Sequence, residues 1–454
     1  MNGKDGEAMS DLNFGKNETL FGECWNTLYR IGNANQSVRG LTYFLNLAFQ
    51  CFDGALNADA APKVAVLGVD FPEELIYAAG AVPRFILGGS LKAHVWSDDF
   101  VPRDADPVSR SILGFINAPD APYNGDTLFL VPLTSDSMRK IAYQLTREGR
   151  NVCVVDIPPV RGTPDSMRQW EQEALRVTET IAAHTGRHVT ARSLRNALDL
   201  TDDARDALRE FLRVASARED ILTCSARVLV QNSYYYASDL AEWTERLRRL
   251  NAELRLLGQR GEALNRPGVL LTGSPICFPN DKILFLMEET GLSVLRYADA
   301  STLAALTPPM TRRPIFSDAL IRAIADRWYL CDGSPAYTSN ETLYADISGC
   351  VREGWAEGVV IHVLKGQIEY DFELERLEKL CDSCGVPVFR LETDYQYQDV
   401  EQLRIRLEAF SEMLTQNRIR REVESHQECE TTPEASEKAR EMSAPTSEKG
   451  ARAA

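Results

Sequence analysis

Short apolar runs alternate with amphipathic stretches along most of this chain. Lys63–Val69 is a continuous apolar run, which is typical of a strand buried on both faces. Pro72–Ala81 follows it and opens with a proline and two glutamates, which favour the first turn of a helix. Since this order of strand, loop and helix returns several times, we expect parallel sheets covered by helices on both faces.

The pattern occurs twice in corresponding form. KVAVLGVDFPEELIYAAGAVPRFIL in the first half matches GVLLTGSPICFPNDKILFLMEETGLSVLRY in the second, each reading as strand, loop, helix, glycine turn and strand. This predicts an α/β fold with two doubly wound (flavodoxin/Rossmann-like) domains. Ligands of such sheets bind beyond the carboxyl ends of the strands. We therefore expect one cleft lined by the strand-end loops 68–72, 133–137, 273–281 and 364–370.

The remaining segments have a different composition. Residues 164–265 are rich in Arg, Glu, Ala and Leu at helical spacing and contain no convincing strand, so they predict a helical insert. The C-terminal segment is polar and charged, which predicts disorder. The expected organisation is an N-terminal helical segment (1–60), a first α/β domain (61–163), the insert (164–265), a second α/β domain (266–420) and a disordered tail (421–454).

Composition narrows the possible partners and compartments. With 454 residues, of which 44% are hydrophobic, the chain can bury a large core. A formal net charge of -16 argues against nucleic acid or an anionic membrane as the main partner. The sequence shows no apolar signal region, no long apolar run and no dense cysteine framework, so we expect a cytoplasmic protein with reduced thiols. It also shows no Walker A or GxGxxG motif, which argues against ATP hydrolysis or NAD binding by this chain.

Several strings, in this order, resemble one enzyme family. They are FPEELIYAAGAVPRF, VPLTSDSMRKIA, LLTGSPI, HVLKGQIEYDFELERLE and VPVFRLETDYQYQDVEQLRIRLEAFSEML. Over about residues 60–415 the chain resembles the large subunits of 2-hydroxyacyl-CoA dehydratases and the related benzoyl-CoA reductases. The resemblance implies a lyase subunit that binds an acyl-CoA and pairs with a homologous dehydratase subunit. It also implies that an ATP-dependent activator supplies an electron for the radical elimination of water.

The same resemblance implies a [4Fe-4S] cluster held by three cysteines at strand ends. At the matching positions this chain has Gly68, Ser135 and Gln367. Iron–sulfur clusters need soft thiolate ligands, which these residues do not provide. We therefore expect the partner subunit to carry the cluster, and we assign no metal ligand in this chain.

The resemblance and the strand-end positions together select catalytic candidates. Glu74, in the PEEL string, is a candidate for lining the acyl pocket, although two acids there also simply favour a helix start. Ser135 follows a strand and suits a helix N-cap, where free N–H groups attract a thioester oxygen or a phosphate. His362 lies near the end of a core strand and is either substrate-facing or an ordinary buried histidine.

Cations and cysteines supply further candidates. Arg84, Arg110 and Lys140 are possible partners for CoA phosphates. Cys277 lies in a strand-end loop, where it either has a functional role or is a small apolar side chain. The pair at 381 and 384 forms a single C-x-x-C at a helix end, which indicates packing rather than a metal site.

Three functions stay open from the sequence. The leading interpretation is a dehydratase subunit that contributes to acyl-CoA binding. A benzoyl-CoA reductase-like subunit is the second, because the string KGQIEYDFEL suits that branch equally well. A non-catalytic paralogue that binds acyl-CoA or acts as a scaffold is the third.

Overall fold

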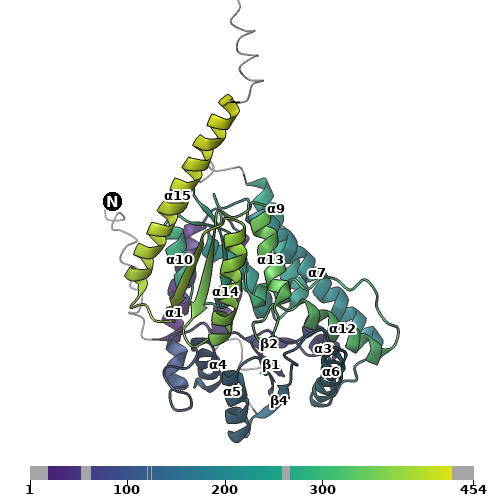
Figure 1. Ribbon diagram of the computed structural model, residues 1–454. Helices are drawn as coiled ribbons and strands as arrows, with labels where there is room; N and C mark the ends of the chain where they lie inside the picture. The colour runs from purple at the N-terminus through teal and green to yellow at the C-terminus, as the bar shows by residue number, and fades with distance from the viewer. Residues whose placement is uncertain (1–18, 53–62, 120, 124, 258–265, 432–454) are drawn as a thin grey trace, which may run out of the picture.

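The computed structural model describes residues 19–52, 63–119, 121–123, 125–257 and 266–431 (Figure 1). Two four-stranded sheets form its framework, and every pair of neighbouring strands is parallel. The first sheet has the order β2-β1-β3-β4. It consists of β1 (Val64–Leu67), β2 (Pro83–Ile86), β3 (Leu128–Pro132) and β4 (Asn151–Val155).

The second sheet repeats this arrangement with the order β6-β5-β7-β8. In both sheets the first strand of the unit pairs with the second on one side and with the third on the other. This shared topology confirms the α/β fold with two parallel sheets separated by helices. The second sheet consists of β5 (Gly268–Gly273), β6 (Ser293–Ala298), β7 (Gly358–Leu364) and β8 (Val388–Thr393).

Helices connect the strands of each sheet and cover its faces. The first sheet is accompanied by α3 (Glu73–Ala78), η3 (Lys92–Trp96), α4 (Pro107–Asn117) and α5 (Asp136–Arg147). The second is accompanied by α10 (Lys282–Glu289), α11 (Ala300–Ala305), α12 (Ser317–Cys331), α13 (Glu341–Arg352), α14 (Ile368–Ser383) and α15 (Val400–Thr431). Figure 1 shows α15 running along the second sheet and then projecting beyond the body of the molecule.

The helical region between the sheets is part of the main core. Its elements are α6 (Pro164–Thr185), α7 (Ala191–Ala215), α8 (Cys224–Asn232), η4 (Ser233–Tyr236) and α9 (Leu240–Leu256). The largest apolar core is continuous across these helices, one face of the first sheet and the N-terminal helices α1 (Leu20–Ala34) and α2 (Leu41–Phe52). Trp170 and Trp243 are fully buried in it, so the insert is anchored by large aromatic side chains.

The two α/β units touch closely where their strand-end loops meet. The backbone N–H of Asn280 donates to the carbonyl of Gly89 at 3.1 Å. Gly89 has a φ of +99°, and a Cβ at this position would lie 2.4 Å from the carbonyl oxygen of Cys277. Glycine is therefore required here both for the backbone conformation and for the approach of the two units.

Two expectations from the sequence need correction. The predicted disorder from residue 421 is wrong for residues 421–431, which continue α15 as a helix, while 432–454 lie outside the described residues. A loop is the sequence-based expectation for Cys331, which precedes Asp332 and Gly333, but the structure has it as the last residue of α12. Helices α11 to α13 occupy a stretch for which the sequence pattern gave no assignment.

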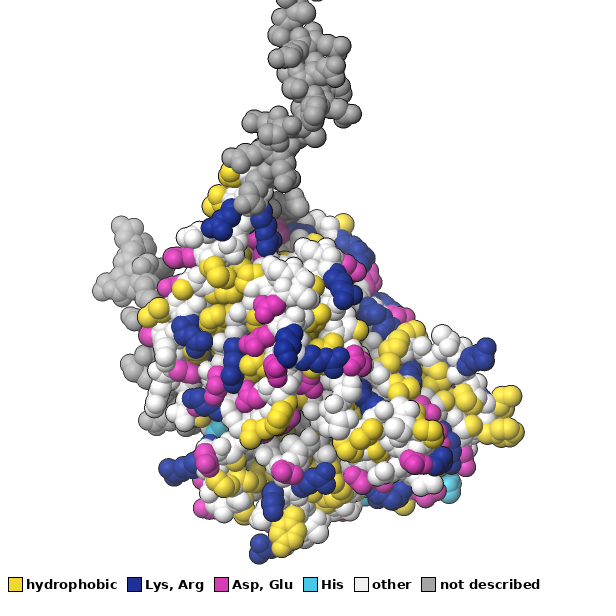
Figure 2. Space-filling model, viewed as in Figure 1, with side chains coloured by type: hydrophobic (Ala, Val, Ile, Leu, Met, Phe, Trp, Pro, Cys, Tyr) yellow, Lys and Arg dark blue, Asp and Glu magenta, His cyan; other side chains and the backbone are white. Residues whose placement is uncertain are grey.

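The surface carries charges of both signs. Figure 2 shows Lys and Arg side chains interspersed with Asp and Glu over the face that carries α13 and α14. No helix in the described part of the chain combines the length and the apolar composition that a membrane span requires.

Candidate functional site

A cavity of about 110 Å³ lies between the two α/β units, at the carboxyl ends of their strands. All four strand-end loops named from the sequence contribute to it. Gly68 and Ser135 come from the first unit, and Cys277 and Gln367 come from the second. Three positions that the sequence singled out, Gly68, Ser135 and Gln367, are therefore brought together by the fold.

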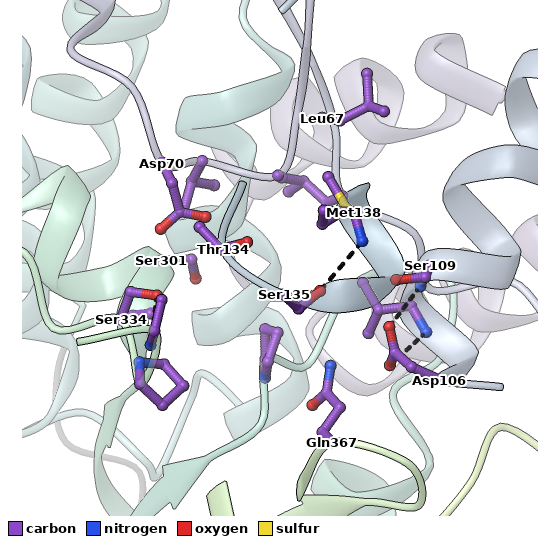
Figure 3. A pocket seen from close by; sticks show the side chains of 18 of the residues that line it. Leu67, Asp70, Asp106, Ser109, Thr134, Ser135, Met138, Ser301, Ser334 and Gln367 are labelled. Carbon is purple, nitrogen blue, oxygen red and sulfur yellow. Dashed lines mark hydrogen bonds between the residues drawn. The ribbon is translucent and has the colours of Figure 1, made fainter. Parts of the chain in front are cut away.

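Two helix N-termini border this cavity. Ser135 caps α5, and its Oγ accepts a hydrogen bond from the N–H of Met138 at 3.2 Å (Figure 3). Asp106 caps α4 and accepts from the N–H groups of Val108 and Ser109 at 3.2 and 2.9 Å. Both capping residues line the cavity. The N-cap predicted at Ser135 is confirmed, and its hydroxyl proton remains able to donate to a ligand.

Gln367 presents an acceptor without a partner. Its side chain lines the cavity and is 8% exposed, yet no described group donates to its Oε1. Figure 3 places it across the cavity from Ser135. A buried polar atom without a hydrogen bond is costly, so a donor from a bound molecule would relieve that cost.

Asp70 is a second such group, which the sequence analysis missed. It lines the cavity near Ser301 and Ser334, and its Oδ1 is buried and has no partner. Burial raises the pKa of Asp70 well above its usual range, and the nearby Asp332 raises it further. Burial also raises the pKa of Asp332 to about 6. The charged form of Asp70 is therefore disfavoured, and when protonated its carboxyl can donate as well as accept a hydrogen bond.

The other charged groups on the cavity wall are acidic. Asp106 and Glu369 also line it, and burial raises the pKa of both carboxyls. Among the described residues no lysine or arginine lines this cavity. The cavity therefore suits a small, uncharged group that carries hydrogen-bond donors and acceptors, and it does not suit a phosphate.

Comparison with known proteins agrees with this architecture. Residues 69–414 match the family model described as 2-hydroxyglutaryl-CoA dehydratase, D-component. That match covers well over half of the chain, and it includes the second sheet, strands β2 to β4 of the first sheet and the helices between the sheets. The chain belongs to the 2-hydroxyglutaryl-CoA dehydratase D-component family.

Individual relatives of this D-component homologue are distant but match over most of their length. It is similar to YjiM of Escherichia coli K12, named as a dehydratase subunit, with 27% identity over 79% of this chain and 93% of the relative. It is also similar to the beta subunit of (R)-phenyllactyl-CoA dehydratase from Clostridium sporogenes, with 24% identity over 76% of this chain and 89% of the relative. A third relative is the beta subunit of (R)-2-hydroxyglutaryl-CoA dehydratase from Acidaminococcus fermentans, with 23% identity over 79% of this chain and 94% of the relative.

The D-component family is known for iron–sulfur clusters, but the donors in this cavity do not fit one. Such clusters are held by several cysteine thiolates. Cys277 is the cysteine among the described residues that line the cavity, and burial raises the pKa of its thiol well above the usual range. In the described part of the chain no three His, Cys, Asp or Glu side chains are grouped to hold a metal ion.

Glu74 lies outside the cavity, in a buried ion-pair cluster. Its Oε1 accepts from Arg205 at 2.6 Å and also from Arg327. Arg205 donates as well to Glu73 at 2.6 Å, and the Glu74 and Arg205 side chains are fully buried. Burial alone would raise the pKa of Glu74, but the two arginines outweigh it and lower the pKa to about 2. These ion pairs explain the presence of a glutamate at position 74 by a structural role.

His362 is also buried beside the site without lining it. Its Nδ1 lies 3.1 Å from the carbonyl oxygen of Ser274, and its Nε2 has no partner among the described residues. Burial, with a smaller contribution from the Lys282 ammonium, lowers the pKa of His362 to about 4. The imidazole is therefore neutral at pH 7.

The three cations predicted to contact CoA phosphates are not brought together. Arg84 donates to the Sγ and the carbonyl of Cys51, at 3.0 and 2.9 Å, beside a different hollow. Arg110 donates to Asp98 at 2.6 Å, and Lys140 is exposed on α5. None of the three lines the interdomain cavity.

Proposed function

We propose that this D-component homologue binds the acyl end of an acyl-CoA in the interdomain cavity. In this proposal it supplies half of the substrate site of a 2-hydroxyacyl-CoA dehydratase-type enzyme. The observation that carries the proposal is the convergence of four strand-end loops on a cavity with two buried, unpartnered acceptors. The family match supplies the choice of an acyl-CoA, and two relatives are named as beta subunits of such enzymes.

The chemistry of the cavity suits the reaction. A 2-hydroxyacyl-CoA loses water to give an enoyl-CoA, so the site must hold one hydroxyl and one thioester carbonyl. The Oε1 of Gln367 can accept from the hydroxyl, since no protein group donates to it. The hydroxyl of Ser135, at the start of α5, can donate to the carbonyl oxygen. The carboxyl of Asp70, whose charged form is disfavoured by burial, can accept and, when protonated, can also donate.

We propose further that the family's cluster cysteines are replaced in this chain by Gly68, Ser135 and Gln367. A homologous partner subunit would then carry the [4Fe-4S] cluster, and an ATP-dependent activator would deliver the electron. This is supported by the presence of a single thiol, that of Cys277, among the described residues that line the cavity. Anaerobic reconstitution with iron and sulfide should leave the isolated chain without a cluster. About four irons per chain would contradict this, with a cysteine-bearing homologue treated in parallel as the control.

The same donor set also favours a second candidate, a non-catalytic acyl-CoA-binding paralogue. Assembly with the homologous subunit and the activator separates the two functions, with enoyl-CoA formation as the measurement. Turnover that requires this chain, and that is lost in Ala336→Trp but kept in Ala183→Trp, supports the dehydratase subunit. Ala336 lines the cavity, whereas Ala183 is exposed on α6, so the pair isolates the effect of filling the cavity. Acyl-CoA binding without turnover in a folded assembly would instead support the paralogue.

A further inference from the structure

A second cavity, of about 320 Å³, is lined by basic side chains, whereas the charged side chains of the interdomain cavity are acidic. Four arginines line it: Arg209 and Arg213 from α7, Arg227 from α8 and Arg296 from β6. Among the described residues no aspartate or glutamate lines it. In a chain with a formal net charge of -16, such a wall is a local reversal of sign. We name it the arginine cavity.

Three of these arginines form ion pairs with carboxylates that do not line the cavity. Arg209 pairs with Asp206, Arg227 with Glu219 and Arg296 with Asp346. The Arg227 side chain is also tied to the carbonyl of Val294 at 2.7 Å, and its buried Nε has no partner. These pairs fix the guanidinium groups and leave part of their donor capacity unused.

Arg213 is the cation that remains available. Its side chain is exposed, and no group in the described part of the chain forms an ion pair or hydrogen bond with its guanidinium. Guanidinium groups recognise phosphates through paired hydrogen bonds, which makes an anion the expected occupant.

The rest of the wall is apolar and partly aromatic. Leu212, Val228 and Tyr297 line it, and Trp355 contributes an indole that is 53% exposed. An exposed indole offers a face on which a flat ring can stack. A volume of about 320 Å³ lies at the lower end of the range of small-molecule sites, about 300–1,000 Å³.

The arginine cavity is separate from the interdomain cavity. Helices α8 and α11 stand between them: Asn232 and Ser301 line the interdomain side, and the adjacent Gln231 and Thr302 line the other. The Nε2 of Gln231 donates to the Oγ1 of Thr302 at 2.5 Å, which holds this wall together.

We infer that the arginine cavity binds a phosphate carried on a flat heteroaromatic body, the chemistry of a nucleotide. The inference does not rest on the proposed function, since the cavity and its charges are present whatever the acyl site does. Two sources share this chemistry: a free nucleotide, and the 3′-phosphorylated adenosine end of CoA.

Calorimetric titration with AMP, with adenosine 3′,5′-bisphosphate and with inorganic phosphate tests the inference. At least one nucleotide should bind more tightly than inorganic phosphate, and the binding should weaken with added salt. Preference for the bisphosphate points to CoA, and preference for AMP points to a free nucleotide. No nucleotide binding by a chain shown to be folded would overturn the inference.

Variants at exposed positions locate the site without endangering the fold. Arg213→Gln should weaken nucleotide binding about tenfold, as expected for loss of a hydrogen bond to a charged group. Trp355→Leu should weaken it about fivefold through lost stacking. Arg192→Gln is the matched control, because Arg192 is exposed at the other end of α7. Equal affinity of Arg213→Gln, Trp355→Leu and the control would overturn the inference. Ala336→Trp should leave nucleotide binding unchanged, which separates this result from the acyl-CoA test.

Discussion

The carboxyl groups in the loop after β1 and at the start of α3 have opposite environments: those in α3 are paired with arginines, and the one in the loop lines a cavity. On one side, Glu73 and Glu74 are neutralised by Arg205, and Glu74 also by Arg327. On the other side, Asp70 lines a cavity where no described lysine or arginine reaches it. The first arrangement pairs its charges within the fold, so removing one partner would leave a buried charge uncompensated. The second leaves the Asp70 carboxyl, whose pKa burial raises, with an unpartnered oxygen on the wall of a cavity, where a ligand can supply the missing hydrogen bond.

Removing Glu74 should have the largest effect. Glu74→Gln leaves the buried Arg205 and Arg327 without part of their counter-charge, which typically costs about 3–5 kcal/mol. Urea unfolding measures this loss against Glu375→Gln, an exposed control. A loss similar to that of the control would show that the ion-pair cluster does not support the fold.

The stability that Asp332 contributes should change with pH in the direction opposite to that of Glu74. The pKa of Asp332 is raised in the folded state to about 6, so its contribution to stability is present below about pH 4 and is lost as the pH rises through 6. Asp332→Asn should remove the part of the pH dependence that comes from this group. In the wild type that part amounts to a change of up to about 3 kcal/mol in the free energy of unfolding between about pH 4 and pH 6.

Unfolding midpoints of the wild type and Asp332→Asn, recorded from pH 4 to pH 7, measure this change in stability. Glu74 cannot produce the same signal, because its lowered pKa makes stability fall only as the pH drops from about 4.5 toward 2. Parallel pH profiles of Asp332→Asn and the wild type would contradict the raised pKa of Asp332.

Gln367 should show a smaller effect, on ligand binding. If its Oε1 accepts from the substrate hydroxyl, Gln367→Leu should weaken a 2-hydroxyacyl-CoA about 3- to 10-fold. The matching acyl-CoA without the hydroxyl serves as the control, because it offers no donor and should bind both proteins alike. An equal loss for both esters would assign Gln367 to cavity shape rather than to hydroxyl recognition.

Much of the framework could be predicted from the sequence. Strands such as β1 and β7 are apolar runs bounded by turn residues, and their loops indicated the cleft correctly. The stretch that holds α12 and α13 gave no clear pattern, although Trp328 and Tyr329 in α12 pack against Trp170 of the insert. Those contacts bridge distant segments, and a local pattern does not show them.

The site was harder to predict for the same reason. The sequence points to Glu74 and gives no signal at Asp70, and it does not show that Arg205, far along the chain in α7, folds against Glu74. The arginine cavity was missed because Arg213 and Trp355 come from segments that meet only in the fold. Ser135 was predicted well because N-capping is a local property of the chain.

The most direct test of the central claim is acyl-CoA binding measured by calorimetry on three proteins. The wild-type chain, Ala336→Trp and Ala183→Trp are titrated with the same series of acyl-CoA esters, alone and with the homologous subunit. The account predicts that the wild type and Ala183→Trp bind alike, while Ala336→Trp, which fills the interdomain cavity, loses at least about tenfold in affinity. Equal binding by all three folded proteins, or no binding by any of them, would contradict the account.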